Sequence, residues 1–367
     1  MKIRLFVALI TLFPVSNSLR AQDIFSGYEH LFTPPLHYVA YYVQDTPQID
    51  GRISESAWAL VPWSAEFVDI EGESKPLPRY STRFKLLWDS SYLYLAALME
   101  EPHISATLTQ HDQIVYNDND FEVFIDPDND NYNYFEIEVN ALNTLFDLFL
   151  SKPYRDGGPI SIEWDVEGIQ SAVYIDGTLN DPTDTDRKWI VEMAIPVKAL
   201  QKDKIVSQII PGSFWRINFS RVQWEAEVGD GVYKKKINPS TGRPYPEHNW
   251  VWSPQGVVNM HYPERWGYLW FASFPTQRKE FVLPPAEELK SYLWLIYYKQ
   301  KEFYQTNRSY AEYLSLIEMP SQIVTKDNGR CELTMVGKGR GFEAGIVCDE
   351  KTEYWQIDQH GKLLKMQ

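Results

Sequence analysis

Basic residues and long apolar runs are scarce in this sequence, and each scarcity excludes a class of protein. Lys and Arg number 35 against 50 Asp and Glu, so the formal net charge is −15. A nucleic-acid partner is therefore not expected, because phosphate binding needs clustered basic side chains. Beyond the N-terminus no run reaches the ~20 apolar residues that a membrane span needs, so we expect no membrane span in the mature chain.

Cysteine and the motifs of nucleophilic catalysis are also scarce. The chain has 2 Cys, Cys331 and Cys348. It has no G-x-S-x-G nucleophile elbow, so a serine hydrolase is not indicated. Aromatic residues are abundant instead, with 13 Trp and 23 Tyr. Trp and Tyr combine a flat apolar face with a polar edge, which suits both a core and a surface that stacks on sugar rings.

The N-terminus has the pattern of a secretory signal peptide over residues 1–21. Lys2 and Arg4 form a short basic region, and "LFVALITLF" follows as an apolar region. The stretch "SLRAQD" then offers a cleavage point after Ala21. We therefore expect an exported protein, periplasmic or extracellular, in which the two cysteines could form a disulfide.

Residues 22–274 are predicted to form an all-β, antiparallel, jelly-roll-like sandwich. Short runs with strand character alternate with turn signals rich in Asp, Asn, Gly and Pro, and this rhythm favours a sandwich. Trp88, Trp189 and Trp215 fall within apolar strand patterns and are expected in the core.

The pattern changes in residues 275–367, which we predict to be a small C-terminal α+β appendage. Apolar residues recur at nearly helical spacing over residues 286–305. Ser309 and Glu312 have the spacing of a capping box for a second short helix. Three strand-like runs at the end of the chain predict a small antiparallel sheet.

The segment "NDFEVFIDPDNDNYNYFEIEVN" is predicted to be a hairpin with one apolar and one acidic face. Side chains in a strand alternate between faces, so Glu122, Glu136 and Glu138 lie opposite the apolar residues. Glu122 and Glu138 could be neighbours on adjacent strands. Three interpretations are open: a catalytic acid pair, a calcium loop, or the polar floor of a ligand groove.

The turn of this hairpin does not match an EF-hand. Asp126, Asp128 and Asp130 fit its first three ligand positions. Asn131 stands where the glycine is required, and Ile137 replaces the bidentate Glu. A looser calcium site and a solvated turn rich in Asp and Asn both stay open.

Five blocks occur in an order that resembles carbohydrate-binding module family 9, a DOMON-type sandwich. The resemblance covers roughly residues 40–273, and its blocks are "IDGRISESAW", "LLWDSSYLYLAALME", "NDFEVFIDP", "WIVEMAIP" and "HYPERWGYLWF". It implies a non-catalytic β-sandwich that binds a polysaccharide or oligosaccharide. Such modules accompany xylan-degrading glycoside hydrolases, which implies a role in polysaccharide catabolism, and some members carry structural calcium.

The resemblance also implies site residues. In sugar-binding members two Trp side chains enclose a sugar, and Tyr116 matches the first of them. Glu122 matches a Glu that binds hydroxyl groups, and Asn218 matches an amide on a later strand. Two positions depart from the family's pattern: Glu138 stands where the family has an Arg, and Met260 stands near the position of the family's second Trp. Trp252 could replace that missing Trp, and otherwise the groove is open on one side.

Two other functions remain as alternatives. Distant relatives of this sandwich hold haem as electron carriers, and Met260 and His261 are adjacent. Adjacent strand residues face opposite ways, so they could not both ligate one iron. Glu122 and Glu138 could instead serve a glycoside hydrolase, which uses one protonated and one ionised carboxyl group.

The two cysteines are predicted to face each other across a second hairpin, in "CELTMVGKGRGFEAGIVCD". A two-residue turn at Gly339 and Arg340 suits type II′, which takes Gly first. Counting outward from this turn places Cys331 opposite Cys348. We therefore predict a disulfide between them.

Overall fold

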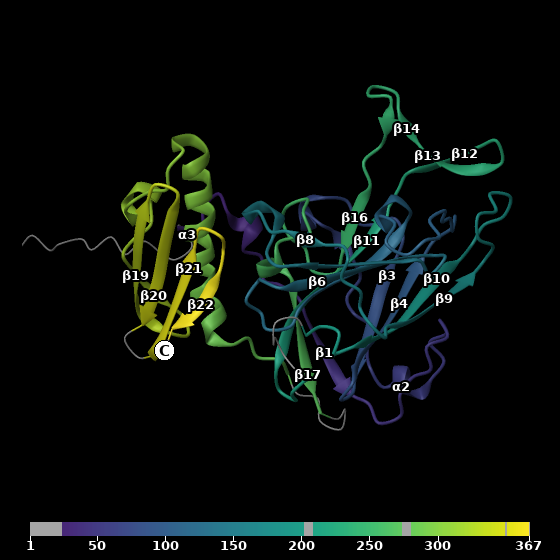
Figure 1. The fold of residues 1–367 in the computed structure, drawn as a ribbon, viewed down its shortest axis with the longest axis horizontal. Helices are drawn as coiled ribbons and strands as arrows, with labels where there is room; N and C mark the ends of the chain where they lie inside the picture. Colours follow the sequence, from purple (N-terminus) through teal and green to yellow (C-terminus); the bar gives the residue numbers. More distant parts are fainter. Residues whose placement is uncertain (1–23, 202–207, 274–279, 349–350, 367) are drawn as a thin grey trace, which may run out of the picture.

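The computed structural model describes residues 24–201, 208–273, 280–348 and 351–366. The predicted signal peptide, residues 1–21, lies outside the described residues. One sheet of 13 strands dominates the described chain (Figure 1). Its strands are β1 (His37–Tyr42), β2 (Val68–Asp69), β3 (Thr82–Trp88), β4 (Tyr92–Glu100), β5 (Asp120–Asp126), β6 (Tyr134–Asn140), β7 (Leu145–Leu150), β8 (Ile160–Ser161), β9 (Gln170–Asp176), β10 (Lys188–Pro196), β11 (Phe214–Gln223), β16 (His248–Val251) and β17 (Gly267–Ala272).

The large sheet curls into two walls around a shared core. Its strand order is β8-β7-β6-β5-β11-β17-β1-β3-β4-β10-β9, and β16 pairs with β11 and β2. The neighbours along this order are antiparallel except at β1, which is parallel to both β17 and β3. The prediction of an all-β sandwich is confirmed, with β1 as a departure from a purely antiparallel sheet.

The core lies between the two walls because both present apolar residues at every second position. Phe121 and Ile137 of one wall and Phe84 and Leu95 of the other are fully buried in the same cluster. Trp88, Trp189 and Trp215 are buried in it as well, as predicted. The opposite face of β5, β6 and β7 is thereby left to polar residues, since side chains alternate along a strand.

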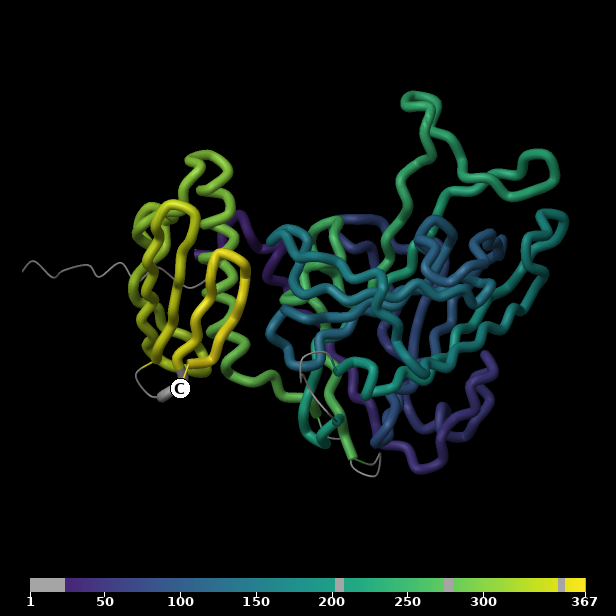
Figure 2. The backbone as a smooth tube through the Cα atoms, in the orientation of Figure 1, coloured from purple at the N-terminus to yellow at the C-terminus, as the bar shows by residue number. Residues whose placement is uncertain are grey.

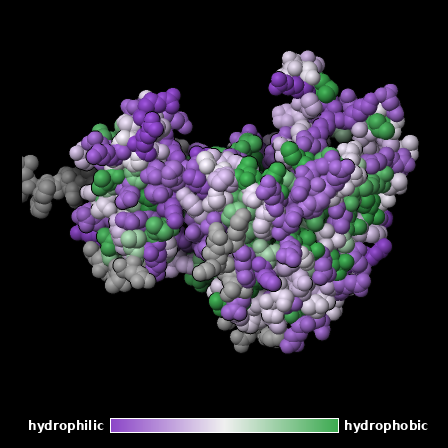
Figure 3. Space-filling view, in the orientation of Figure 1, coloured by the Kyte–Doolittle hydropathy of each residue, from purple (hydrophilic) through white to green (hydrophobic). Residues whose placement is uncertain are grey.

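Short elements connect the strands or project from the sandwich. An arm of two small hairpins extends away from the body (Figures 1 and 2) and is mostly hydrophilic in the space-filling view (Figure 3). Its strands are β12 (Ala226–Gly229), β13 (Val232–Lys235), β14 (Ile237–Asn238) and β15 (Arg243–Pro244). The short helices are α2 (Ser56–Ala59) and the 3-10 turns η1 (Glu29–Leu31), η2 (Gly72–Ser74), η3 (Val115–Asn117), η4 (Tyr154–Asp156) and η5 (Pro263–Arg265).

The C-terminal part consists of helix α3 (Pro285–Asn307), the 3-10 turn η6 (Leu314–Ile317) and a five-stranded antiparallel sheet (Figure 1). One face of α3 packs on the sheet through a second apolar cluster that includes Leu293, Ile296 and Ile346. Among the helices described, none has a stretch both long enough and apolar enough to cross a membrane. The strands are β18 (Gln322–Thr325), β19 (Gly329–Lys338), β20 (Gly341–Cys348), β21 (Lys351–Asp358) and β22 (Leu363–Met366).

The second helix expected after Ser309 does not form, and Ser309 and Glu312 make no capping box. The chain is held there by tertiary hydrogen bonds instead. The N–H of Tyr310 donates to the carbonyl of Gly339, and the N–H of Ala311 donates to the Gln300 side chain. Only the turn η6 follows. The predicted boundary between residues 274 and 275 lies outside the described residues.

Buried polar contacts join the C-terminal part to the sandwich. Arg216 on β11 donates to Glu287 at the start of α3 over 2.8 Å, and the Tyr268 hydroxyl donates to the same carboxylate. Beside them, the guanidinium of Arg216 lies 3.9 Å from the centre of the Tyr268 ring. Because these groups are desolvated, the contacts between them fix α3 against the sandwich more firmly than exposed ion pairs would.

Cys331 and Cys348 form a disulfide in the predicted register. Strands β19 and β20 pair from Lys338 opposite Gly341 outward to Cys331 opposite Cys348. Gly339 has a φ of 59°, the positive value that a type II′ turn requires at its first position. The disulfide links β19 to β20, and α3 packs on β20 and β21.

Removing this disulfide is expected to lower the free energy of unfolding by about 3 kcal/mol at most, because it closes a short loop. The two cysteines are separated by 17 residues. The measurement is urea unfolding of the protein and of its C331S/C348S variant. Mass spectrometry after alkylation without reduction checks the bridge itself, and uptake of two alkyl groups would contradict it.

Candidate functional site

The outward face of β5, β6 and β7 carries the candidate site. Glu122 lies directly opposite Glu138, and Phe124 lies opposite Glu136. Strand alternation predicts only that these carboxylates share one face of the sheet, and the pairing of β5 with β6 brings them close together. A groove of about 550 Å³ opens above them. We call Glu122, Glu136 and Glu138, together with the adjacent Asp120, the acidic floor.

The rim of the groove is apolar and aromatic. Tyr116, in η3, is 41% exposed, and Tyr154, in η4, is 40% exposed. Both line the groove, as do the exposed aliphatic residues Ile114, Ile160, Ile162 and Val258. An apolar rim above polar groups is the arrangement of many small-molecule sites, in which the polar groups fix orientation.

Tyr116 and Tyr154 are held in place by different neighbours. The carbonyl of Tyr116 accepts a hydrogen bond from the Trp224 indole over 2.8 Å. The N–H of Tyr116 donates to Glu138 over 2.9 Å, which ties the rim to the acidic floor. The ring of Tyr154 meets that of His261 edge to face at 4.2 Å between centroids. The backbone of Tyr116 and the ring of Tyr154 are thus held in place, and both side chains are partly exposed.

Burial favours the protonated, neutral form of the carboxyl groups in the acidic floor. It raises the pKa of Glu122 to about 7. Burial, and then repulsion by neighbouring carboxylates, raises the pKa values of Asp120, Glu136 and Glu138 well above their usual range. A protonated carboxyl group donates as well as accepts hydrogen bonds, so this floor can do both toward hydroxyl groups.

The floor receives little positive charge from its surroundings. Among the described residues that line the groove, none is Lys or Arg. His261 lies 3.9 Å from Glu136, but burial lowers the pKa of its imidazole to about 3, so the ring is neutral. The Tyr134 hydroxyl and Nδ1 of His261 are 3.0 Å apart.

Four of the six predicted ligand-binding residues line the groove, namely Tyr116, Glu122, Glu138 and Met260. Met260 is buried, and it belongs to an apolar cluster beneath the rim that includes Trp266. Its carbonyl accepts a hydrogen bond from the Trp266 indole over 2.7 Å. Met260 thus contributes to one wall without a flat aromatic face.

Asn218 and Trp252, the other two predicted ligand-binding residues, do not line the groove. Asn218 is fully buried. Its side-chain NH₂ donates to the carbonyl of Ser253 over 2.8 Å, and its side-chain oxygen accepts from the N–H of Ser253 over 3.0 Å. Trp252 is buried in the sandwich core, 5.2 Å from the ring of Phe84. Asn249 and Asn259 line the groove instead and offer the amide groups that Asn218 was expected to supply.

Glu136 and Tyr154 line the groove but were not among the six predicted ligand-binding residues. Strand alternation correctly placed Glu136 on the acidic face with Glu138, although no binding role was assigned to it. Tyr154 lies in η4, in the connection between β7 and β8. Its position above the floor depends on the path of this connection and on its contact with His261, which is distant in sequence. No local pattern marks such a residue.

The three aspartates of the hairpin turn lie close together at some distance from the acidic floor. One oxygen of each of Asp126, Asp128 and Asp130 lies within 4.8 Å of the others. Both carboxylate oxygens of Asp126 already accept backbone hydrogen bonds, from Asn129 over 3.0 Å and Asn131 over 2.9 Å. These bonds account for the turn, and calcium binding by it stays a prediction.

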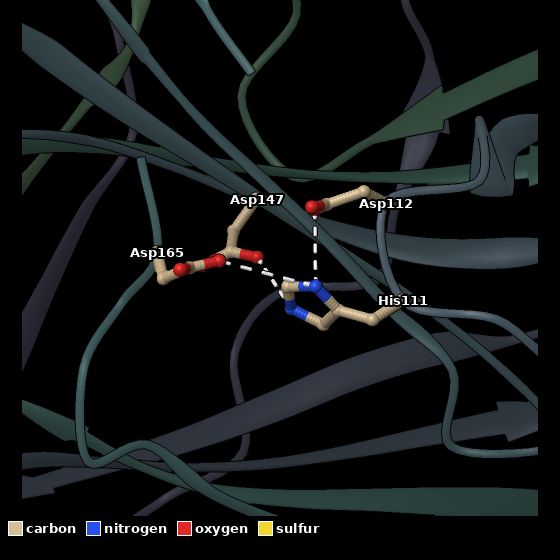
Figure 4. Close-up of side chains that lie close together, drawn as sticks. All are labelled: His111, Asp112, Asp147 and Asp165. Carbon is tan, nitrogen blue, oxygen red and sulfur yellow. Dashed lines mark ion pairs between the residues drawn. The ribbon is translucent and has the colours of Figure 1, made fainter. Parts of the chain in front are cut away.

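A further acidic group surrounds His111 beside the groove (Figure 4). One imidazole nitrogen of His111 lies 3.1 Å from Asp147, and the other lies 3.1 Å from Asp112 and 3.9 Å from Asp165. In this group the imidazole stands between the carboxylates and contacts Asp112 and Asp147 through its two nitrogens. The acidic floor lacks such a partner.

The structure changes the argument about Met260 and His261. Neither lies in a strand, and both line the groove, so strand alternation does not separate them. The His261 ring also packs against Phe124 and Tyr134. Nδ1 of His261 faces the Tyr134 hydroxyl, so a haem iron could be ligated only through Nε2, which lies 3.9 Å from Glu136.

Comparisons with known proteins give one family match and several similar solved structures. Residues 49–210 match the family described as "Carbohydrate family 9 binding domain-like". Among solved structures, a proposed carbohydrate-binding protein from Bacteroides uniformis is similar over 65% of this chain and 100% of its own, with 18% identity and a TM-score of 0.48.

A family 9 carbohydrate-binding module from Caldicellulosiruptor kristjanssonii is similar in two complexes. Its glucose complex has 17% identity and a TM-score of 0.41, and its cellotriose complex 16% and 0.42; each match covers 68% of this chain and 100% of the module. None of the curated proteins matches the chain. The match over residues 49–210 includes β5, β6 and β7, so the chain carries a carbohydrate family 9 binding domain-like region, and the acidic floor belongs to it.

Proposed function

We propose that the chain is a non-catalytic protein that binds a polysaccharide or oligosaccharide in the groove above the acidic floor. The observation that carries the proposal is the pairing of two exposed tyrosine rings, Tyr116 and Tyr154, with buried carboxyl groups beneath them. Aromatic faces cover the apolar faces of a pyranose ring, and carboxyl and amide groups form directed hydrogen bonds with its hydroxyls.

Binding is favoured over hydrolysis by the placement of the two glutamates. Glu122 and Glu138 lie side by side on adjacent strands of the floor. Hydrolysis needs a protonated and an ionised carboxyl group on either side of the bond to be cleaved. Two carboxyl groups that lie side by side on one floor do not flank a bond in this way.

The biological setting is part of the proposal. The basic and apolar pattern of residues 1–21 supports export, and the family 9 match supports a role beside glycoside hydrolases in polysaccharide breakdown. An exported chain would meet polymers such as xylan directly. Peptide sequencing of the protein recovered from its native host tests export, since cleavage after Ala21 is the expected result.

The purified mature chain is expected to bind at least one member of a glycan panel, because the groove offers both a stacking surface and hydroxyl partners. Affinity electrophoresis against soluble polysaccharides and calorimetry with oligosaccharides are the measurements. No reducing sugar should be released, and no Soret band should be visible. Failure to bind any glycan would count against the proposal, and steady turnover or stoichiometric haem would each favour one of the alternatives.

A further inference from the structure

With all its carboxyl groups ionised, the acidic floor would hold more negative charge than its described surroundings can balance. Asp120, Glu122 and Glu138 are each at most 5% exposed. One oxygen from each lies within 4.8 Å of the others, which is the spacing of ligands around a single ion. Buried carboxylates without a cation are costly, so such a group is normally paired, protonated or bound to a metal.

One oxygen in the floor has no hydrogen-bond partner. Oδ2 of Asp120 is buried and unpartnered, and the other oxygen of this carboxyl group accepts from the N–H of Val222 at 3.3 Å. Ser220 lies directly opposite Glu122 on β11 and adds a hydroxyl oxygen to the same face. Buried polar atoms are rarely left unsatisfied, so the unpartnered oxygen of Asp120 indicates a missing ligand.

Two other acidic groups among the described residues are better partnered than the floor, where one backbone N–H donates to Glu138 and one to Asp120. In the turn, Asp126 accepts two backbone N–H groups, as described above. Beside the groove, the imidazole of His111 lies between Asp112 and Asp147 (Figure 4). At the floor, no Lys or Arg is found among the described lining residues, and the imidazole of His261 comes no closer to Glu136 than 3.9 Å.

We propose that the acidic floor binds one divalent cation of the calcium class through Asp120, Glu122 and Glu138. All three donors are carboxylate oxygens, and the nearby Ser220 and Glu136 add further oxygens, which is the ligand type that Ca²⁺ prefers over softer metals. Ca²⁺ takes 6–8 oxygen ligands, so three side chains leave positions open on the side of the groove.

The open positions suggest how the cation acts, and this step rests on the proposed function. Glu122 and Glu138 line the groove, so a cation held between them faces a bound sugar. Paired sugar hydroxyls could complete its coordination while the rings of Tyr116 and Tyr154 cover the apolar face of the sugar. Glycan affinity is then expected to fall at least tenfold when the cation is removed.

Calorimetry tests the cation site in the absence of any sugar. The full chain, stripped with EDTA and dialysed, is titrated with CaCl₂, and terbium luminescence sensitised by the nearby tyrosines reports on the same site. Asp120→Asn and Glu138→Gln are expected to weaken binding at this site at least tenfold. Both substitutions keep the side-chain volume, and neutral side chains suit a buried floor, so we expect both variants to fold.

The matched control is Asp128→Asn in the hairpin turn, which should leave this binding unchanged. The proposal is overturned if the stripped protein binds no calcium, or if binding is lost in the Asp128 variant and kept in the other two. Circular dichroism verifies folding, and a calcium-induced rise in melting temperature that Glu122→Gln abolishes provides a second measurement.

Sugar titrations with and without calcium then separate the two ideas. If the protein binds glycan but has no calcium site, the proposed cation site is overturned and the proposed function stands. If it binds calcium but no glycan, the proposed function is overturned and the cation site stands.

Discussion

Replacing Tyr154 by alanine is expected to weaken glycan binding at least tenfold, which corresponds to about 1.4 kcal/mol. Tyr154 is 40% exposed above the acidic floor and contributes the face on which a sugar ring can stack. Buried aromatic anchors commonly cost 1 to 2 kcal/mol or more when truncated. Tyr116→Ala should have a similar effect, because its ring lines the same groove. Calorimetry with the best ligand of the glycan panel is the measurement.

Two control variants separate stacking from a general disturbance. Tyr154→Phe keeps the aromatic face and removes the hydroxyl, so it should retain most of the affinity. Tyr313→Ala removes a tyrosine that is 63% exposed on the C-terminal part, and it should bind like the unaltered protein. If Tyr154→Ala and Tyr116→Ala both bind normally, the sugar does not occupy this groove.

The regular parts of the fold could be predicted because they follow local rules. Alternation over residues 120–126 and 134–140 separates the apolar from the acidic face, and it places Glu122 and Glu138 on one side. The turn at Gly339 is fixed by a positive φ that favours glycine, so the register of the following strands could be counted out to the cysteines.

The irregular parts could not be predicted, because long-range packing decides them. Trp252 and Asn218 have side chains suited to a sugar site, yet the chain around Ser253 folds back over β11 and buries both. The short strands β18 and β22 have four residues each and exist because longer strands pair with them. In both cases a partner distant in sequence supplies the missing information.

Arg155 illustrates such a long-range contact, because it joins the groove to the C-terminal helix. It follows Tyr154 in η4, and its side chain is only 15% exposed. Its guanidinium forms an ion pair with Glu264 at 2.8 Å and donates to the hydroxyl of Tyr297 on α3 over 3.1 Å. The same guanidinium lies 4.0 Å from the centre of the Tyr262 ring. The contacts therefore link η4, the segment before β17, and α3.

Replacing Arg155 by methionine is expected to lower the free energy of unfolding by about 3 to 5 kcal/mol. Methionine retains much of the apolar stem, but the carboxylate of Glu264 then stays buried without its cation, and breaking a buried pair from one side costs this much. Urea unfolding followed by tryptophan fluorescence is the measurement. Glycan binding should weaken as well, since η4 also positions Tyr154.

The control is Arg187→Met, which removes an arginine from an exposed pair with Asp176. Arg187 has a side chain that is 77% exposed, and solvent-exposed pairs contribute about 1 kcal/mol or less. A loss below about 1 kcal/mol in both variants would show that Arg155 does not hold η4 and α3 together. The double variant Arg155→Met with Glu264→Gln gives the decisive comparison. Removing the uncompensated charge should recover part of the lost stability, whereas a purely steric effect of the first substitution would leave the loss unchanged.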